Sequence, residues 1–214
     1  MTSQPIDRQL HRLSTPRAAA VAGVLFALLF GTALVMIRIS LPEGAEPGSQ
    51  WADGGHGIRT SAVLIPFAGI AFLWFIGVVR DGFGGFEDKF FSSVFIGSGL
   101  LFLAMIFVSS AVGVALTHSG PDGAVFGQAL LLALSKTYAL RMGAVFMISL
   151  ATIWLKTGLM PKWLVGVTYL VAVGLILSAD LTMWLTMAFP TWVLVVSLLL
   201  LSRAGVIDLK RDGL

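Results

Sequence analysis

The amino-acid sequence predicts an all-α protein, a polytopic bundle of about six transmembrane helices with both termini in the cytoplasm. Hydrophobic residues make up 57% of its 214 residues and charged residues 12%, whereas a soluble domain carries about 25% charged residues to hydrate its surface. Several apolar runs reach the roughly 20 residues that a helix needs to cross a hydrocarbon core of about 30 Å. Basic residues lie dispersed between these runs, so they predict membrane topology and not a nucleic-acid-binding face.

The first 17 residues are polar and basic and are predicted to form a cytoplasmic leader. The apolar run over residues 18–40 exceeds the roughly 7–15 residues of a signal-peptide core, so we expect a retained first span. Residues 42–58 have the Gly, Pro and acid content of a loop. In the second span, residues 59–79, Pro66 predicts a kink or a local break in the backbone hydrogen bonds.

The third span, residues 90–117, is long enough to require tilt or an extension beyond the bilayer. Residues 124–155 contain no proline and exceed the length that any bilayer needs. We expect the first third of this stretch to lie along the membrane interface and the fourth span to occupy residues 136–155. A short basic turn then leads to the fifth span, residues 163–180.

The last crossing leaves two alternatives open. In the first, Asp180 marks the turn and the sixth span covers residues 182–202. In the second, which we prefer, the turn lies near Ala188 and Phe189. Pro190 then takes the first helical position, where its missing N–H costs little, and the sixth span covers residues 190–206.

The distribution of Lys and Arg predicts the orientation of this single bundle, residues 18–207, and of a cytoplasmic tail, residues 208–214. With the N-terminus inside, ten basic residues lie on the cytoplasmic side: Arg8, Arg12, Arg17, Arg80, Lys89, Lys156, Lys162, Arg203, Lys210 and Arg211. Four lie outside: Arg38, Arg59, Lys136 and Arg141. The positive-inside rule therefore places both termini in the cytoplasm.

Four polar residues fall where the hydrocarbon makes charge costly. Arg141 lies about five residues inside the fourth span, and three interpretations remain open. It pairs with Asp180, or it snorkels to the headgroups, or it attracts anions or gates an outward-facing cavity. Asp180 needs a partner such as Arg141, Arg38 or Lys136, unless it stays protonated and serves proton-coupled transport.

The turn between the second and third spans carries five charges: Arg80, Asp81, Glu87, Asp88 and Lys89. We interpret it as a solvated loop whose basic residues anchor the topology, with a cytoplasmic binding or gating loop as the alternative. Its glycines lack the strand–turn–helix context of a phosphate-binding loop.

Two further patterns concern packing. Small residues recur four positions apart, which lets helix backbones approach closely. They predict that spans one, three and five lie inside the bundle or mediate a dimer. These pairs are Ala19/Gly23, Ala27/Gly31, Ser93/Gly97, Ser109/Gly113 and Gly174/Ser178. The tryptophans and Tyr138 lie mostly near predicted span ends and indicate an aromatic belt at the membrane surfaces.

No residue pattern predicts catalysis, a metal site or a cofactor. The chain has no cysteine and three histidines without HxxxH spacing. A nucleophile–base pair is equally missing from the sequence pattern, so we do not expect an enzyme.

Three stretches resemble a group of uncharacterised bacterial integral membrane proteins, chiefly actinobacterial. They are ALRMGAVFMISLATIWLKTGLMPKWL from Ala139, the final FPTWVLVVSLLLL, and RDGFGGFEDKFFSSVFIGSGLLFLAMIF from Arg80. The resemblance implies a short six-span protein of the bacterial plasma membrane. It implies no activity and no functional residues.

The sequence is therefore compatible with two functions. We expect a non-enzymatic helical bundle that binds lipid or a membrane-protein partner, including a second copy of the chain. The alternative is a small transporter or channel with an outward-facing polar pocket around Arg38, Arg141 and Asp180. A water-accessible cavity reaching Arg141 would favour transport, and a closed Arg141–Asp180 pair in a sealed bundle would favour the structural role.

Overall fold

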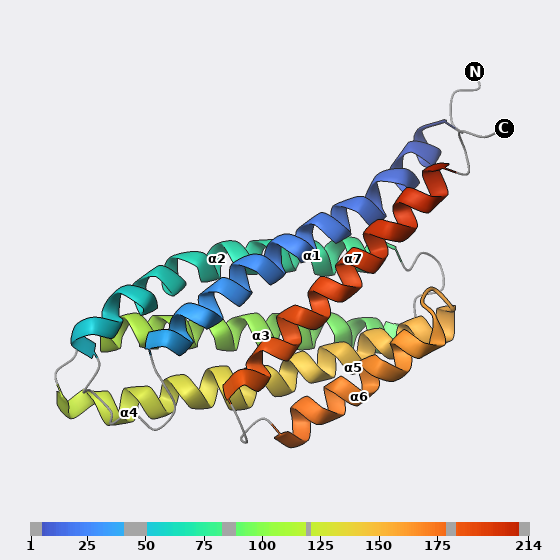
Figure 1. Ribbon diagram of the computed structural model, residues 1–214. Coiled ribbons are helices and arrows are strands. Elements are labelled where there is room, and N and C mark those ends of the chain that lie inside the picture. Colours follow the sequence, from blue (N-terminus) through green and yellow to red (C-terminus); the bar gives the residue numbers. More distant parts are fainter. Residues whose placement is uncertain (1–5, 41–50, 83–88, 119–120, 179–182, 210–214) are drawn as a thin grey trace.

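The computed structural model describes residues 6–40, 51–82, 89–118, 121–178 and 183–209, and over these ranges the chain is helical with no strand. The elements are α1 (Ile6–Ser40), α2 (Trp51–Asp81), α3 (Lys89–Leu116), α4 (Pro121–Leu132), the π-helical segment η2 (Ala133–Tyr138), α5 (Ala139–Thr157), α6 (Lys162–Ser178), the 3₁₀ segment η3 (Met183–Met187) and α7 (Ala188–Leu209) (Figure 1). The predicted all-helical class is confirmed for this part of the chain.

Five helical stretches are long and apolar enough to cross a membrane. They are Ala20–Ser40, Gly55–Asp81, Lys89–Leu116, Gly123–Thr157 and Leu185–Ser202. A shorter apolar helix, Lys162–Leu177, accompanies them. It belongs to α6, whose 17 residues extend about 25 Å, slightly less than a hydrocarbon core of about 30 Å. The chain is therefore compatible with a multi-pass membrane protein.

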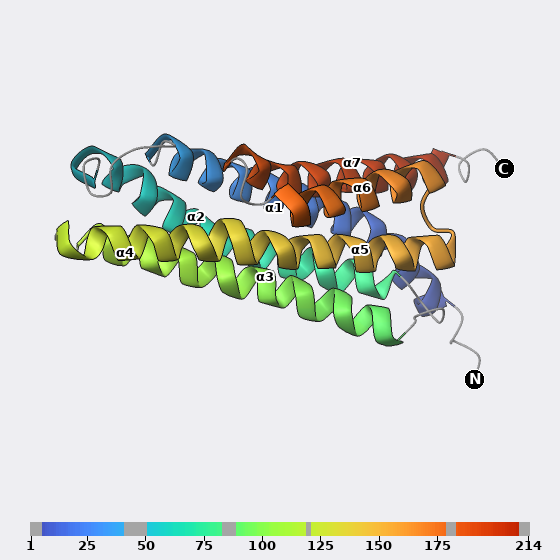
Figure 2. The ribbon, with the colours of Figure 1, turned by 90° about the horizontal axis from the view of Figure 1, so that it is seen from below.

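The helices form two groups that lie side by side. In one group α1 packs against α2 and α7, in the other α5 packs against α3 and α6, and α2 and α3 join the groups. Helix α1 begins and α7 ends at the same end of the bundle (Figures 1 and 2). We name this end the terminal end. The opposite end, where α1 ends and α4 begins, is the far end.

Aromatic side chains join the two groups at the centre of the bundle. The fully buried ring of Phe72 lies within 4.6–6.2 Å of five other phenylalanine rings, measured between centroids. These belong to Phe26, Phe75, Phe102, Phe146 and Phe189, from α1, α2, α3, α5 and α7. Because lipid tails are as apolar as these side chains, the helices associate through close packing of this kind and not through exclusion of water.

The turn before the last helix differs from the preferred sequence interpretation. Helix α6 ends at Ser178 and helical backbone resumes at Met183, so the turn does not lie near Ala188 and Phe189. A 3₁₀ segment leads directly into α7, as is common at helix N-termini. Pro190 is the third residue of α7, still within the first turn, where a missing N–H is tolerated. Asp180 itself lies outside the described residues.

Helices α4 and α5 also differ from expectation, because they run on in one line through η2 (Figure 2). The first third of this stretch was expected to lie along the interface, which would require it to turn away from the fourth span. Instead α4 stays against α3, where a Cβ atom on Gly127 would collide with the side chain of Leu116. This close approach keeps the helical rod straight beyond the length of a single span.

Pro66 bends α2 without interrupting it. The helix continues from Trp51 to Asp81, and it curves over its first half (Figures 1 and 2). The Pro66 ring is exposed on the outside of the bundle. The predicted kink is therefore present as a bend, because the ring removes one N–H donor while the neighbouring turns keep theirs.

Candidate functional site

Arg38 lies in the last turn of α1, near the far end. Its Nη2 donates a hydrogen bond to Thr186 Oγ1 at 2.9 Å, which joins the last turn of α1 to η3. Arg38 is half-buried there.

Three other basic residues share the side of the membrane that the sequence predicts for Arg38. Arg141 precedes Leu155 on α5 by 14 residues, or about 21 Å, and Lys136 lies about 7 Å further along the rod. Arg59 precedes Val79 on α2 by 20 residues, or about 30 Å. We call Arg38, Arg59, Lys136 and Arg141 the far-end basic group. They are the four basic residues that the sequence places on the outer side.

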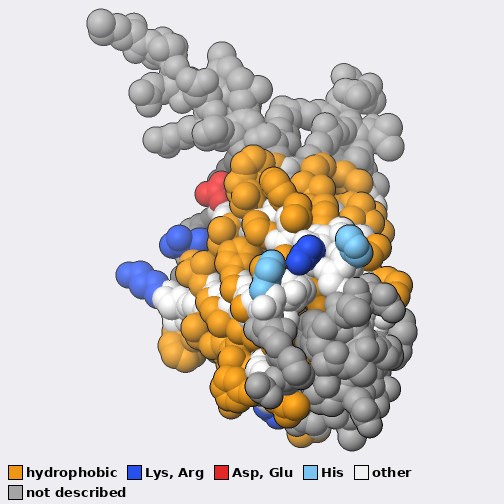
Figure 3. All heavy atoms as spheres, turned by 90° about the vertical axis from the view of Figure 1, so that its left-hand side faces the viewer, with side chains coloured by type: hydrophobic (Ala, Val, Ile, Leu, Met, Phe, Trp, Pro, Cys, Tyr) orange, Lys and Arg blue, Asp and Glu red, His pale blue; other side chains and the backbone are white. Residues whose placement is uncertain are grey.

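The side chains of this group differ in burial. Arg59 is exposed, whereas Lys136 and Arg141 are half-buried, and each of these two makes an interaction with a partner. Since Asp180 lies outside the described residues, its pairing with Arg141 stays a prediction. Figure 3 looks onto the far end and shows basic and histidine side chains gathered among hydrophobic ones.

The charged turn at the terminal end is described only in part. Arg80 and Asp81 are exposed at the end of α2, and Lys89 is exposed at the start of α3. Glu87 and Asp88 lie outside the described residues. The described residues therefore cover only the two ends of this turn.

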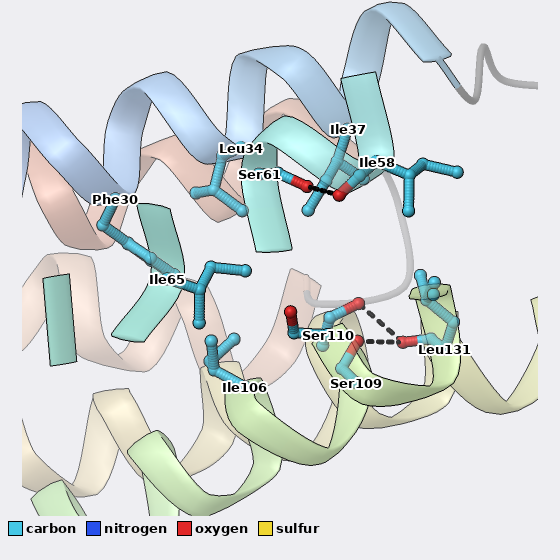
Figure 4. Close-up of a pocket in the computed structure, with 12 residues that line it drawn as sticks. Phe30, Leu34, Ile37, Ile58, Ser61, Ile65, Ile106, Ser109, Ser110 and Leu131 are labelled. Atoms are coloured by element: carbon cyan, nitrogen blue, oxygen red, sulfur yellow. Dashed lines mark hydrogen bonds between the residues drawn. The ribbon is translucent and has the colours of Figure 1, made fainter. Parts of the chain in front are cut away.

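A small pocket lies between α1 and α2 on one side and α3, α4 and η2 on the other (Figure 4). Its volume is about 20 Å³, comparable to the space that one water molecule requires. Apolar side chains such as Phe30, Ile65 and Ile106 form most of its wall, and four serines interrupt them. The pocket is lined by Phe30, Leu34, Ile37, Ile58, Ser61, Ile65, Ile106, Ser109, Ser110, Gly113, Leu131 and Ser135.

Serine hydroxyls in this pocket bind backbone carbonyls. Ser109 Oγ on α3 and Ser135 Oγ on η2 both donate to the Leu131 carbonyl, at 3.1 and 2.7 Å. Ser61 Oγ donates to the Ile58 carbonyl at 2.8 Å. A π-helical turn shifts the hydrogen-bonding register by one residue, and hydroxyls are a usual way to satisfy carbonyls near such a turn within a membrane. The bond from Ser109 thus ties α3 to the end of α4.

Aromatic rings close the bundle on the terminal side of the pocket. Phe30, one of the lining residues, contacts Phe26 at 5.2 Å and Phe102 at 5.6 Å between ring centroids. These rings continue into the cluster around Phe72 described above. Arg141 is not among the residues that line the pocket.

Two of the tryptophans belong to the core and not to a surface belt. Trp154 and Trp192 are 3% and 5% exposed, and their ring centroids lie 6.2 Å apart. The Trp192 Nε1–H donates to Thr168 Oγ1 at 3.0 Å. By contrast Trp74 and Trp163 are 70% and 60% exposed. The belt interpretation is therefore wrong for the buried pair, whose large rings fill the space between α5 and α7.

The small-residue pairs have different surroundings. A Cβ atom on Gly23 would collide with Ser197 Oγ and the Phe75 ring, so α1 approaches α7 and α2 closely there. Ser109 and Gly113 are buried and line the pocket. A Cβ atom on Gly174 of α6 would meet no neighbour within 4 Å. The pairs at Gly23 and at Ser109/Gly113 therefore pack inside the bundle, whereas Cβ atoms on Gly97 of α3 and Gly174 of α6 would have no neighbour within 4 Å.

We call the pocket lined by Ser61, Ser109, Ser110 and Ser135 the serine pocket. The sequence does not predict it, because no single element contains all four serines. Its hydroxyls come from three separate elements. From the sequence alone, each serine is expected to bond to a backbone carbonyl of its own helix. The π-helical segment Ala133–Tyr138 has no distinctive composition either. Among the described residues, no cluster of three or more His, Asp or Glu side chains could hold a metal ion.

The comparisons with known proteins add no relative. No protein-family model, curated protein or solved structure matches this chain.

Proposed function

We propose that the chain is a multi-pass protein of the bacterial plasma membrane, of the uncharacterised group that its sequence resembles. It crosses six times with both termini in the cytoplasm, and it is a non-enzymatic bundle that binds anionic phospholipid headgroups at its far end. The far end then faces the outside of the cell.

One pattern carries this proposal, namely that the four residues of the far-end basic group are the basic residues that the sequence predicts on the outer side. Counted from Val79 on α2 and from Leu155 on α5, Arg59, Lys136 and Arg141 lie about 20–30 Å along their helices, a distance close to the thickness of a hydrocarbon core, and Arg38 lies in the last turn of α1. Lipid phosphates lie at this depth. Basic clusters at the membrane surface recognise anionic headgroups, and Arg binds phosphate through several donors at once.

The packed aromatic centre favours binding over transport. Rings from α1, α2, α3, α5 and α7 contact one another across the bundle axis. A transport path would require these rings to separate, with loss of the packing that holds the helices together. Transport therefore stands as the second candidate, and Arg38 and Arg141, half-buried within the bundle, are the residues it would use.

Lipid binding can be measured on the full-length protein by native mass spectrometry and by titration with phosphatidylglycerol. The variant Arg59→Gln/Lys136→Gln removes two charges of the far-end basic group. Since a basic residue near a lipid surface contributes about 1 kcal/mol, we expect phosphatidylglycerol affinity to fall about tenfold or more, with phosphatidylcholine affinity unchanged.

The matched control is Arg80→Gln/Lys89→Gln, which removes two exposed charges at the terminal end. It should leave the far-end lipids bound when lipid is supplied to the outer leaflet only. Equal losses for both variants would overturn the headgroup site. Ion or small-anion flux in liposomes that depends on Arg141 would replace the proposal with transport.

A further inference from the structure

The serine pocket contains polar oxygen atoms that have no role in the proposed function. Oxygen atoms from Ser61, Ser109, Ser110, Ser135 and the Leu131 carbonyl line this pocket at the junction of the two helix groups, with Ser61 on the α2 side and Ser109 and the Leu131 carbonyl on the opposite side (Figure 4). They lie in a wall that is otherwise apolar. In such surroundings each oxygen gains from any additional hydrogen-bond partner.

These oxygens are mainly acceptors. The hydroxyls of Ser61, Ser109 and Ser135 each donate their hydrogen to a backbone carbonyl, which leaves the oxygen lone pairs to accept. The Ser110 hydroxyl is half-buried and points into the gap between α3 and the α1/α2 pair (Figure 4). A matching ligand must therefore be a small donor of hydrogen bonds.

Size and charge restrict this ligand further. A volume of about 20 Å³ exceeds the roughly 10–15 Å³ that a buried water needs, and it is too small for an acyl chain. No carboxylate is among the lining residues, so a cation would bring an uncompensated charge into the bundle, whereas water would not.

We propose that this pocket binds one water molecule, which donates hydrogen bonds to serine hydroxyl oxygens of α2 and α3, and that α4 moves about this water as a unit. Helix α4 meets the rest of the bundle through a separate cluster of Ile58, Leu116 and Leu131, which does not merge with the main core. Segment η2 divides it from α5. A bridging water exchanges hydrogen-bond partners at low cost, so the junction tolerates small shifts of α4 that a dry contact would resist.

Hydroxyl-radical footprinting of the full-length protein in lipid nanodiscs tests this site, because radicals generated from a bound water oxidise the side chains around it. Leu131 and Ile106 are 4% and 5% exposed, and Leu150 in the main core is fully buried. We expect oxidation of Leu131 and Ile106 several-fold faster than that of Leu150. Oxidation of all three at the same low rate would show a dry pocket and overturn the proposal.

The variant Ser110→Val replaces the hydroxyl with bulk that displaces the water. It should abolish the excess oxidation of Leu131 and slow amide exchange over α4, while lowering the melting temperature. The control Ser93→Val lies on the same helix, where its exposed hydroxyl bonds to Lys89 of its own helix, and it should change none of these readouts. If Ser110→Val raises the melting temperature and leaves the oxidation pattern unchanged, the pocket is an apolar void. Ser110→Ala, which adds no bulk, provides the same oxidation test if the larger substitution prevents folding.

Discussion

The main core and the far end of this bundle use similar residues but are packed in different ways. In the main core, fully buried rings such as Phe72 and Phe146 belong to a single cluster with members on α1, α2, α3, α5, α6 and α7. At the far end, among the residues that the structure describes, Ile58, Leu116 and Leu131 form a small buried cluster that is separate from the main one. Serine hydroxyls and a π-helical segment accompany it.

This difference indicates which part stabilises the fold and which part adapts. Local stability follows the density of buried contacts, and regions with few such contacts open without global unfolding. The aromatic core should therefore determine the resistance of the whole bundle to unfolding. The far end should respond to lipid and water without loss of the fold.

The largest expected effect is that of Phe72→Ala. Truncation of a fully buried ring leaves a cavity and costs about 3 kcal/mol or more in the free energy of unfolding. Unfolding in a detergent titration measures this loss. The control Phe126→Ala removes a ring of α4 that is 74% exposed, and it should cost far less. Similar losses for the two variants would contradict the distinction between the two regions.

Gly23→Ala should come next, because the added methyl group collides with Ser197 Oγ and the Phe75 ring. Overpacking of this kind costs about 1–3 kcal/mol. Gly77 of α2 has open space around it, so Gly77→Ala is the matched control and should be neutral. Adding Ser197→Ala to Gly23→Ala should restore part of the stability, and no restoration would show that α1 and α7 do not meet there.

Thr168→Val tests the contribution of a single hydrogen bond within the main core. It removes the acceptor of the Trp192 Nε1–H, whose bond to Thr168 Oγ1 links α6 to α7. Side-chain hydrogen bonds in membrane proteins contribute about 0.6 kcal/mol on average, so we expect a loss of about that size. Thr32→Val, at an exposed position of α1, controls for the substitution itself. A larger loss for Thr32→Val would exclude this role of the bond.

Leu131→Ala should have the smallest global effect, although Leu131 is as buried as many core residues. Its cluster contains only two other buried residues, so the substitution should speed amide exchange over Pro121–Leu132 with little change in global unfolding. Leu150→Ala, at a fully buried core position, should instead lower global stability by about 2 kcal/mol or more. Equal global losses would remove the distinction between core and far end.

Composition and run length sufficed to predict the helical class, because a membrane requires long uninterrupted apolar segments. The first two expected spans lie within α1 and α2, most of the third lies within α3, the fourth lies within η2 and α5, and residues 163–178 of the fifth lie within α6. The turn before α7 was placed wrongly because Pro190 suits a first helical turn at more than one position. The local preference of proline is similar for several helix starts, so the sequence alone does not predict the 3₁₀ segment that precedes α7.

The candidate site could be predicted only in part. Charge is costly in hydrocarbon, so Arg38, Arg141 and Lys136 were recognisable from sequence alone. Thr186 was not recognisable as the partner of Arg38, because 148 residues separate them. The same holds for Ser109 and Leu131, which meet only because α4 returns along α3. Such contacts depend on tertiary packing and leave no local pattern.

The most direct test uses single-cysteine variants, since the chain has no cysteine of its own. His118→Cys lies at the exposed far end, Gly82→Cys at the exposed terminal end, and Leu170→Cys on α6, where the leucine is 74% exposed in the protein alone. With a membrane-impermeant maleimide on intact cells, we predict that only the far-end cysteine reacts. Gly82→Cys should react after permeabilisation, and Leu170→Cys only after the bilayer is dissolved. Rapid reaction of Leu170→Cys in intact membranes, or of His118→Cys and Gly82→Cys from the same side, would contradict a bundle that spans the bilayer and is solvated by lipid.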